Sequence, residues 1–145
     1  MDIVKIKRSI LKKIEEHALK GYHEHNSEVI GYLIGQYKES WIEINDLIIP
    51  DQQGTNIHAE ITSELAIVEY LRKNKRDINN VQVGWYHSHP SLSCFLSQID
   101  IQTQKYWQKV NNRMVALVID PIKNDVKCFR LDNNDQVYEM KMKSV

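Results

Sequence analysis

Four residues in the segment 87–100 have types and spacing that suit a metal site: His87, His89, Ser97 and Asp100. Side chains of a strand alternate between its two faces, so His87 and His89 project from one face, roughly 6–7 Å apart at the backbone. Ser97 and Asp100 are three residues apart and therefore share one face of a helix. Two imidazoles and one carboxylate leave an open position on a zinc ion, which is typical of a catalytic site.

Each part of this pattern also has a simpler structural explanation. Ser97 and Asp100 match a capping box, in which a serine and an acid bind free backbone N–H groups at the start of a helix. A His-x-His pair is often only the polar end of a strand, and Glu28 is then a solvated acid beside another strand. The histidines nevertheless continue an apolar strand face, where burying two imidazoles without partners costs free energy. A shared metal removes that cost, so we expect these residues to act together.

The composition is that of one globular domain. The chain has 145 residues, of which 42% are hydrophobic and 26% charged, and we expect residues 1–145 to form a single domain. Nineteen basic residues balance nineteen acidic ones, and the basic cluster Lys73, Lys75 and Arg76 is short. Neither nucleic acid nor a membrane is therefore an expected partner.

Two further features of the sequence indicate a cytoplasmic protein. No apolar run approaches the ~18 residues that a membrane span requires, and the charged N-terminal segment has no signal-peptide core. Cys94 and Cys128 are too few for a disulfide framework, so we expect two small buried thiols.

Hydrophobic periodicity predicts the elements that position the candidate ligands. Strands are predicted at 3–7, 28–38, 41–49, 81–89, 114–120, 126–132 and 137–143, and helices from Ser9 to Gly21, at 63–76 and at 97–110. Ser9 is the expected cap of the first helix, Gly21 its end, and 51–57 an exposed loop. Alternation places Val81, Val83 and Trp85 on the face of the histidines. The order of elements predicts a mixed sheet with helices packed on it.

Taken together with Glu28, the pattern resembles the JAMM motif of the MPN+ zinc metalloproteases. That motif reads E…H-[S/T]-H-P-x6-S-x2-D, and the chain fills every fixed position with Glu28, His87-Ser88-His89-Pro90, Ser97 and Asp100. The similarity extends over residues 3–132 and is strongest to the branch of the proteasome-lid deubiquitinase and the signalosome deneddylase. It implies a minimal, archaeal-like member with the MPN fold, an α+β αβα sandwich similar to cytidine deaminases.

The resemblance also implies roles for the motif residues. His87, His89 and Asp100 would bind one Zn²⁺, and Glu28 would act as general base on a water whose pKa the zinc lowers to about 7. Ser97 would stabilise the oxyanion of the reaction. Such enzymes hydrolyse the isopeptide bond after the C-terminal Gly-Gly of ubiquitin or a ubiquitin-like protein, so ubiquitin conjugates and proteasome-type machinery are the implied partners.

Other functions and one departure stay open beside this resemblance. A metal-dependent peptidase that processes sulfur-carrier or ubiquitin-like precursors is one alternative, and a scaffold that lacks catalysis is another. A zinc deaminase needs H-x-E and P-C-x-x-C, and Cys94 and Cys128 do not supply them. Proteasomal relatives usually have glycines in the loop where this chain has Ser91, Leu92 and Ser93, which leaves the loop shape open. The substrate groove is expected near 51–62 and 91–96, and His58 at the surface.

Overall fold

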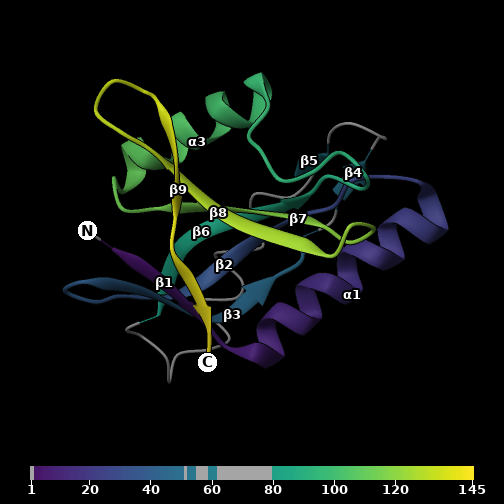
Figure 1. Cartoon of the computed structure of the whole chain (residues 1–145), viewed down its shortest axis with the longest axis horizontal. Helices are drawn as coiled ribbons and strands as arrows, with labels where there is room; N and C mark the ends of the chain where they lie inside the picture. The colour runs from purple at the N-terminus through teal and green to yellow at the C-terminus, as the bar shows by residue number, and fades with distance from the viewer. Residues whose placement is uncertain (1, 51, 55–58, 62–79) are drawn as a thin grey trace.

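A curved mixed sheet with a helix on each face forms the structure, a computed structural model that describes residues 2–50, 52–54, 59–61 and 80–145 (Figure 1). Its eight described strands follow the order β10 (Met142–Ser144), β1 (Ile3–Ile6), β3 (Trp41–Ile48), β2 (Ile30–Tyr37), β6 (Val81–Ser88), β7 (Val115–Asp120), β8 (Asp125–Leu131) and β9 (Val137–Met140). The pairings β10–β1, β1–β3 and β6–β7 are parallel, and the other four are antiparallel. This confirms the predicted α+β fold.

Each helix buries an apolar stripe against its own face of the sheet. Helix α1 (Arg8–His25) packs through Ile10, Ile14 and Ala18 into the larger core cluster. Helix α3 (Gln98–Val110) packs its Trp107 against the opposite face. The two helices cover opposite sides of the central strands β2, β6 and β7 in Figure 1. Among the described residues, no helix is both long and apolar enough to cross a bilayer.

The C-terminal strand crosses from one edge of the sheet to the other. β9 pairs with β8, whereas β10, which follows after Lys141 alone, runs parallel to β1 at the far edge. Lys141 O accepts a hydrogen bond from Val4 N at 2.8 Å. The prediction of one antiparallel strand over 137–143 is therefore wrong in its second half. The sheet curls until its two edges lie close together. Residues 137–144 therefore supply the last strand at each edge, β9 beside β8 and β10 beside β1.

A half-buried ion-pair cluster closes the curled sheet at the N-terminus. Asp2 accepts two hydrogen bonds from Arg113, Nη2 to Oδ1 at 2.7 Å and Nε to Oδ2 at 3.0 Å. Arg130 Nη1 lies 3.1 Å from the same carboxylate. The side-chain hydrogen bond from Arg113 is the largest contribution that holds the pKa of Asp2 below its ordinary value. The carboxylate thus joins the start of β1 to β8 and to the segment before β7.

The boundaries of α1 differ from the prediction at both ends. The N-cap is Lys7, which makes no side-chain capping bond, and Ser9 lies inside the helix. The helix passes through Gly21 and ends at His25, with Asn26 in the left-handed conformation. A Cβ at Gly21 would lie 2.4 Å from Val29 Cγ1. Gly21 is needed because the chain approaches it closely there, so it does not act as a helix stop.

A small hairpin occupies the region predicted as a loop. β4 (Gln52–Gly54) pairs antiparallel with β5 (Ala59–Ile61), where the sequence predicted an exposed loop over 51–57. The predicted helix 63–76, His58 and the basic cluster at 73–76 lie outside the described residues. Both cysteines are free and buried, as expected, and burial raises the pKa of Cys94 to about 11.

The close packing of β6 against β7 leads to a testable prediction. A Cβ at Gly84 would lie 2.4 Å from Val115 O and 2.8 Å from Val115 Cγ2. Because the obstacle is backbone, we expect Gly84→Ala to lower the free energy of unfolding by about 1–3 kcal/mol in urea denaturation. The exposed Val81→Ala on the same strand should change it by less than about 0.5 kcal/mol. Equal stability of the Gly84→Ala and unsubstituted chains would contradict the packing described.

Candidate metal centre

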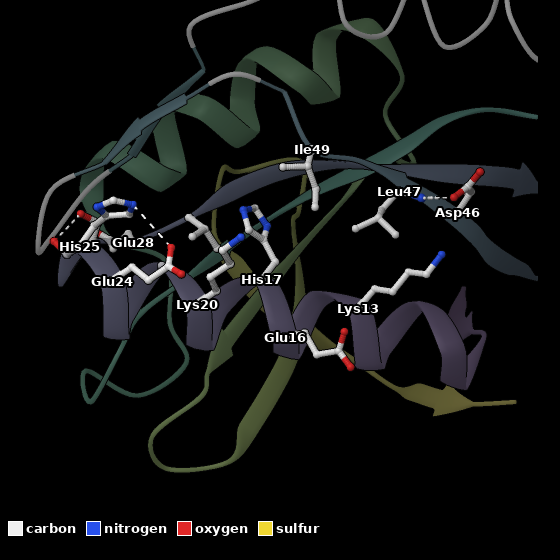
Figure 2. Close-up of a pocket in the computed structure, with 13 residues that line it drawn as sticks. Lys13, Glu16, His17, Lys20, Glu24, His25, Glu28, Asp46, Leu47 and Ile49 are labelled. Carbon is white, nitrogen blue, oxygen red and sulfur yellow. Dashed lines mark hydrogen bonds and ion pairs between the residues drawn. The ribbon is translucent and has the colours of Figure 1, made fainter.

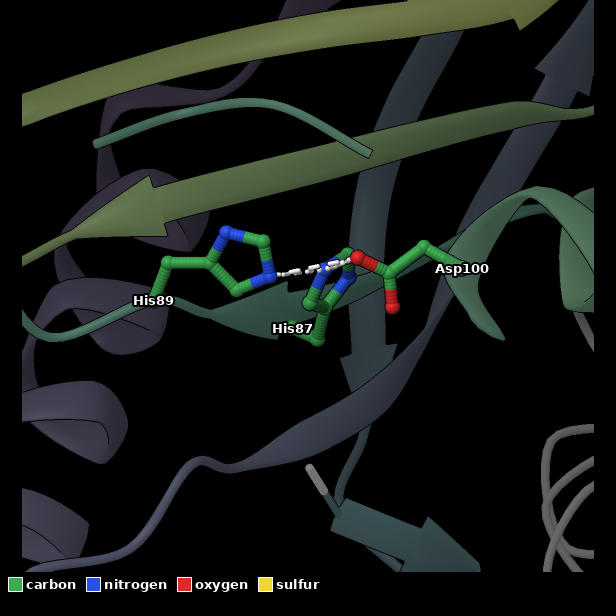
Figure 3. Close-up of side chains that lie close together, drawn as sticks. All are labelled: His87, His89 and Asp100. Atoms are coloured by element: carbon green, nitrogen blue, oxygen red, sulfur yellow. Dashed lines mark hydrogen bonds and ion pairs between the residues drawn. The ribbon is translucent and has the colours of Figure 1, made fainter. Parts of the chain in front are cut away.

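Three side chains from two elements converge on one point. His87 Nε2 lies 3.0 Å from His89 Nε2 and 2.9 Å from Asp100 Oδ2, and His89 Nε2 lies 3.2 Å from the same oxygen. Figure 3 shows the histidines at the end of β6 and Asp100 at the start of α3, with their polar atoms directed at one another. The fold thus brings together the three ligands predicted from the sequence.

The strand end and the helix start fix this convergence through the backbone. His89 N donates to Ile119 O at 2.8 Å, which continues the pairing of β6 with β7 past Ser88. Ser97 is the N-cap of α3 in a complete capping box: Asp100 N donates to Ser97 Oγ, and Ser97 N donates to Asp100 Oδ2. The oxygen that meets the histidines is therefore also the capping oxygen. The capping and metal-binding interpretations describe the same atoms.

A bulge in β6 corrects the predicted strand alternation. The pairing with β2 shifts between Leu33, opposite Gly84, and Ile34, opposite Gln82, so Val83 is the extra residue. Val83 consequently packs in the α1 core cluster, whereas Trp85 lies on the α3 face. The prediction that Val83 shares the face of the histidines is wrong, and the prediction for Trp85 is correct.

Trp85 and a helix residue that the sequence reasoning missed support the ring of His87. The rings of Trp85 and His87 stack with centroids 4.7 Å apart and an interplanar angle of 13°. Trp85 Nε1 donates to Gln104 Oε1 at 2.7 Å, and Gln104 is fully buried. Gln104 follows Asp100 by four residues, so shared helix-face spacing was the signal that could have identified it.

Glu28 reaches the site from the neighbouring strand. Ile30 pairs with His87 across β2 and β6, and Ser88 both donates its N–H to Val29 O and accepts from Val29 N through Oγ. This pairing places Glu28 Oε1 3.7 Å from His89 Nε2. Within the described part of the chain, the buried Glu28 Oε2 has no hydrogen-bond partner. Burial raises the pKa of Glu28 to about 7.

The charges of the site are strongly coupled. Burial acts to raise the pKa of Asp100, but hydrogen bonds from His87 and His89 outweigh it and hold the pKa below the usual range. Burial lowers the pKa of His87. For His89 burial acts in the same direction, but the hydrogen bond and charge of Asp100 outweigh it and raise the pKa. The site therefore favours a positive charge beside an ionised carboxylate.

The donor set fits a bound cation better than any arrangement of protons. Each Nε2 offers either one lone pair or one N–H, so protons cannot make a hydrogen bond of all three contacts among His87, His89 and Asp100. A cation between them interacts with all three atoms at once. Ligands about 2.0–2.2 Å from a tetrahedral zinc are about 3.3–3.6 Å apart, slightly more than the 2.9–3.2 Å found here.

The loop after Pro90 adopts a strained path beside the ligands. Ser91 and Ser93 have positive φ angles of 65° and 71°, a conformation that costs a non-glycine residue about 1–2 kcal/mol. The loop therefore has a backbone conformation that glycines would adopt easily, although serines occupy both positions. Ser93 O lies 3.2 Å from His89 Nδ1, and the Phe95 ring contacts the His89 ring at 4.8 Å between centroids.

A buried acid that the sequence reasoning missed holds this loop. Asp120 is fully buried at the end of β7, and its carboxylate accepts hydrogen bonds from the backbone N–H groups of Ser91, Ser93, Ile122 and Lys123, at 2.9–3.0 Å. Burial acts to raise its pKa, but these four bonds outweigh burial and keep the pKa below its ordinary value. A charged residue that ends an otherwise apolar buried strand was the available signal.

Glu28 is one of the residues that line a cavity beside α1. Its volume is about 1060 Å³, and it is lined by α1, the end of β3 and the chain that leads into β2. Figure 2 shows Glu28 at one end, with His17 and Lys20 of α1 on the wall and Ile49 on the opposite side. Polar side chains of α1 and Glu28 therefore line the same cavity.

Comparison with known proteins identifies the fold family. Residues 1–113 match the family described as JAB1/Mov34/MPN/PAD-1 ubiquitin protease. The ubiquitin carboxyl-terminal hydrolase RPN11 of Saccharomyces cerevisiae is 35% identical over 67% of this chain and 32% of its own length. The 26S proteasome regulatory subunit RPN11 of Encephalitozoon cuniculi is 32% identical over 92% of this chain and 47% of its own.

A signalosome protein shows the same relationship. COP9 signalosome complex subunit 5 of Kluyveromyces lactis is 35% identical over 91% of this chain and 38% of its own length. The chain thus spans about a third to a half of the length of these relatives. With the motif, the sheet and the match over residues 1–113 in agreement, the chain belongs to the JAB1/Mov34/MPN/PAD-1 ubiquitin protease family, as its resemblance to the JAMM proteases predicted.

Proposed function

We propose that this chain is a zinc-dependent isopeptidase that hydrolyses the bond after the C-terminal Gly-Gly of ubiquitin or a ubiquitin-like modifier. The observation that carries the proposal is the convergence of His87, His89 and Asp100 within 3.2 Å of one another, 3.7 Å from a buried carboxylate. Names of the relatives, among them a ubiquitin carboxyl-terminal hydrolase and a signalosome subunit, support the substrate class.

His87, His89 and Asp100 would hold the zinc. When bound, zinc supplies a Lewis acid that lowers the pKa of a coordinated water from 15.7 to about 7. The stacking of Trp85 on His87 and the capping bond to Asp100 would keep these two ligands in place. Glu28 would then transfer the proton, and Ser97 would stabilise the developing negative charge.

Glu28 is the proposed general base. Its carboxylate lies beside His89, so it can take a proton from a water at the site and pass it to the leaving lysine amine. A pKa of about 7 suits both halves of that transfer at neutral pH. Its buried Oε2, without a hydrogen-bond partner among the described residues, is free to accept the proton.

Ser97 is the proposed donor to the oxyanion. Its Oγ accepts from Asp100 N in the capping box, which leaves its own O–H proton for donation. The start of α3 adds a favourable dipole for negative charge. Ser97 and Glu28 therefore supply complementary functions, one for negative charge and one for the proton.

We also propose that residues 1–145 form one catalytic domain that acts in the cytoplasm. Its proposed substrates are conjugates of ubiquitin or ubiquitin-like proteins, and its proposed partner is proteasome-type machinery. The pairing of β1 with β10 supports a single unit, because the first and last described strands lie side by side. Two free thiols suit a reducing compartment.

Metal content is the first test of this function. Purified without chelators, the protein should contain about one zinc per chain by mass spectrometry of the metals, since the three ligands form one site. His87→Ala should lose most of that zinc, whereas the exposed His23→Ala removes an imidazole elsewhere and should keep it. Unsubstituted protein with no bound metal would contradict the proposal.

The second test separates the base from the metal ligands. Glu28→Gln should lower the rate of cleavage of ubiquitin chains by about 10²–10⁴-fold, because the amide cannot accept the water proton. Zinc content should stay unchanged. Glu24→Gln, an exposed glutamate that lines the same cavity, should cleave normally. Survival of turnover in Glu28→Gln would show that another group is the base.

The third test distinguishes the two functions of Ser97. Ser97→Ala loses cap and hydroxyl, so we expect about 1 kcal/mol less stability and a kcat about 10²-fold lower. Ser97→Gly costs an N-cap only a few tenths of a kcal/mol and has no side-chain donor, so its stability should be near normal while kcat falls equally. If Ser97→Gly has full activity, Ser97 has only a capping role.

A further inference from the structure

The metal ligand His89 depends on a loop, whereas the other two ligands lie on regular elements. His87 lies within β6 and stacks on Trp85, and Asp100 lies in the capped first turn of α3. His89 follows the end of β6, and its Nδ1 contacts Ser93 O at 3.2 Å, four residues further along. The orientation of the His89 ring therefore follows the path of the chain from Pro90 to Leu96.

That path is not one that the serines prefer. Ser91 and Ser93 both have positive φ angles, which glycine adopts freely and serine does not. Ser91 N donates to Asp120 Oδ1 and Ser93 N to Asp120 Oδ2, each at 2.9 Å. One buried carboxylate thus binds the backbone at both strained positions.

We propose that Asp120 is a positioning residue for the metal site: it holds the loop 90–96 so that Ser93 O accepts a hydrogen bond from His89 Nδ1–H. That bond fixes the ring orientation and the tautomer, which leaves the Nε2 lone pair directed at Asp100 and His87. The proposal rests on the metal site proposed above. Carbonyl partners of this kind are typical for histidines that bind metals.

The turn after β7 completes the arrangement. Asp120 Oδ1 also accepts from Ile122 N and Lys123 N at 3.0 Å, and Lys123 Nζ donates to Ser93 Oγ at 2.9 Å. Two loops from different parts of the chain therefore share one acceptor. An amide at position 120 has a single acceptor oxygen and no charge, so it cannot satisfy all four N–H groups.

Zinc affinity is the first readout. By competition with a chromophoric chelator, Asp120→Asn should bind zinc about 10–100-fold more weakly than the unsubstituted chain. Asp132→Asn is the matched control, since Asp132 Oδ1 likewise accepts two backbone N–H groups, from Asn134 and Gln136, in the turn between β8 and β9. Its zinc affinity should stay within about twofold. If Asp120→Asn does not fold, Asp120→Glu, which keeps the charge but displaces it, replaces it.

A rescue experiment tests the route through the loop. Glycine at positions 91 and 93 adopts positive φ without help, so adding Ser91→Gly and Ser93→Gly to Asp120→Asn should restore a large part of the lost affinity. A general loss of stability would not respond to these changes. No recovery in this triple variant would overturn the role of the loop.

The hydrogen bond from His89 Nδ1–H gives a second readout. In ¹H–¹⁵N spectra of the zinc-loaded chain, the Nδ1–H proton of His89 should exchange slowly with water, and in Asp120→Asn it should exchange faster. If the unsubstituted chain binds zinc but does not cleave ubiquitin conjugates, the proposed function fails while the affinity comparison still decides the role of Asp120. Identical affinity and Nδ1–H exchange in Asp120→Asn, or equal weakening in Asp132→Asn, would overturn the positioning role.

Discussion

Two imidazole nitrogens and one carboxylate oxygen lie within 3.2 Å of one another in a buried site, where protons cannot satisfy all three contacts. A fold that holds such a cluster must supply rigidity from elsewhere, because the groups would separate if they were mobile. Here the strand pairing of β6 with β7 and the capped start of α3 supply it. A cation removes the conflict, so the same rigidity becomes a preformed binding site.

The strand order of the sheet also places Glu28 beside the three clustered side chains. β2 runs antiparallel to β6, so the residue before β2 lies beside the C-terminal end of β6, where the histidines are. Ser88, between the two ligands in sequence, binds Val29 through both its backbone and its hydroxyl. Glu28 is therefore placed by backbone pairing, and its side chain can remain without strong partners. Burial, opposed by the charge of His89, raises its pKa to about 7.

The sequence predicted the site better than it predicted the boundaries of the elements. The three candidate ligands converge and Glu28 lies beside them, since motif spacing reflects local geometry of a strand and a helix start. The ends of α1 were wrong because Gly21 serves a close contact with Val29, a long-range feature that local propensity does not report. The bulge at Val83 and the edge-to-edge crossing at Lys141 depend on partner strands in the same way.

Asp120 was missed for a related reason, and it shows how far a site can extend beyond its motif. Where glycines would let the loop turn freely, Ser91 and Ser93 reach the same conformation only with support. The support comes from a carboxylate at the end of another strand, which also binds the turn after β7. Because the four N–H groups share one buried carboxylate, a displacement of Asp120 would remove the acceptor from both loops at once. The loop beside His89 is therefore held by Asp120, a residue distant in the sequence, where glycines would have reached the same conformation unaided.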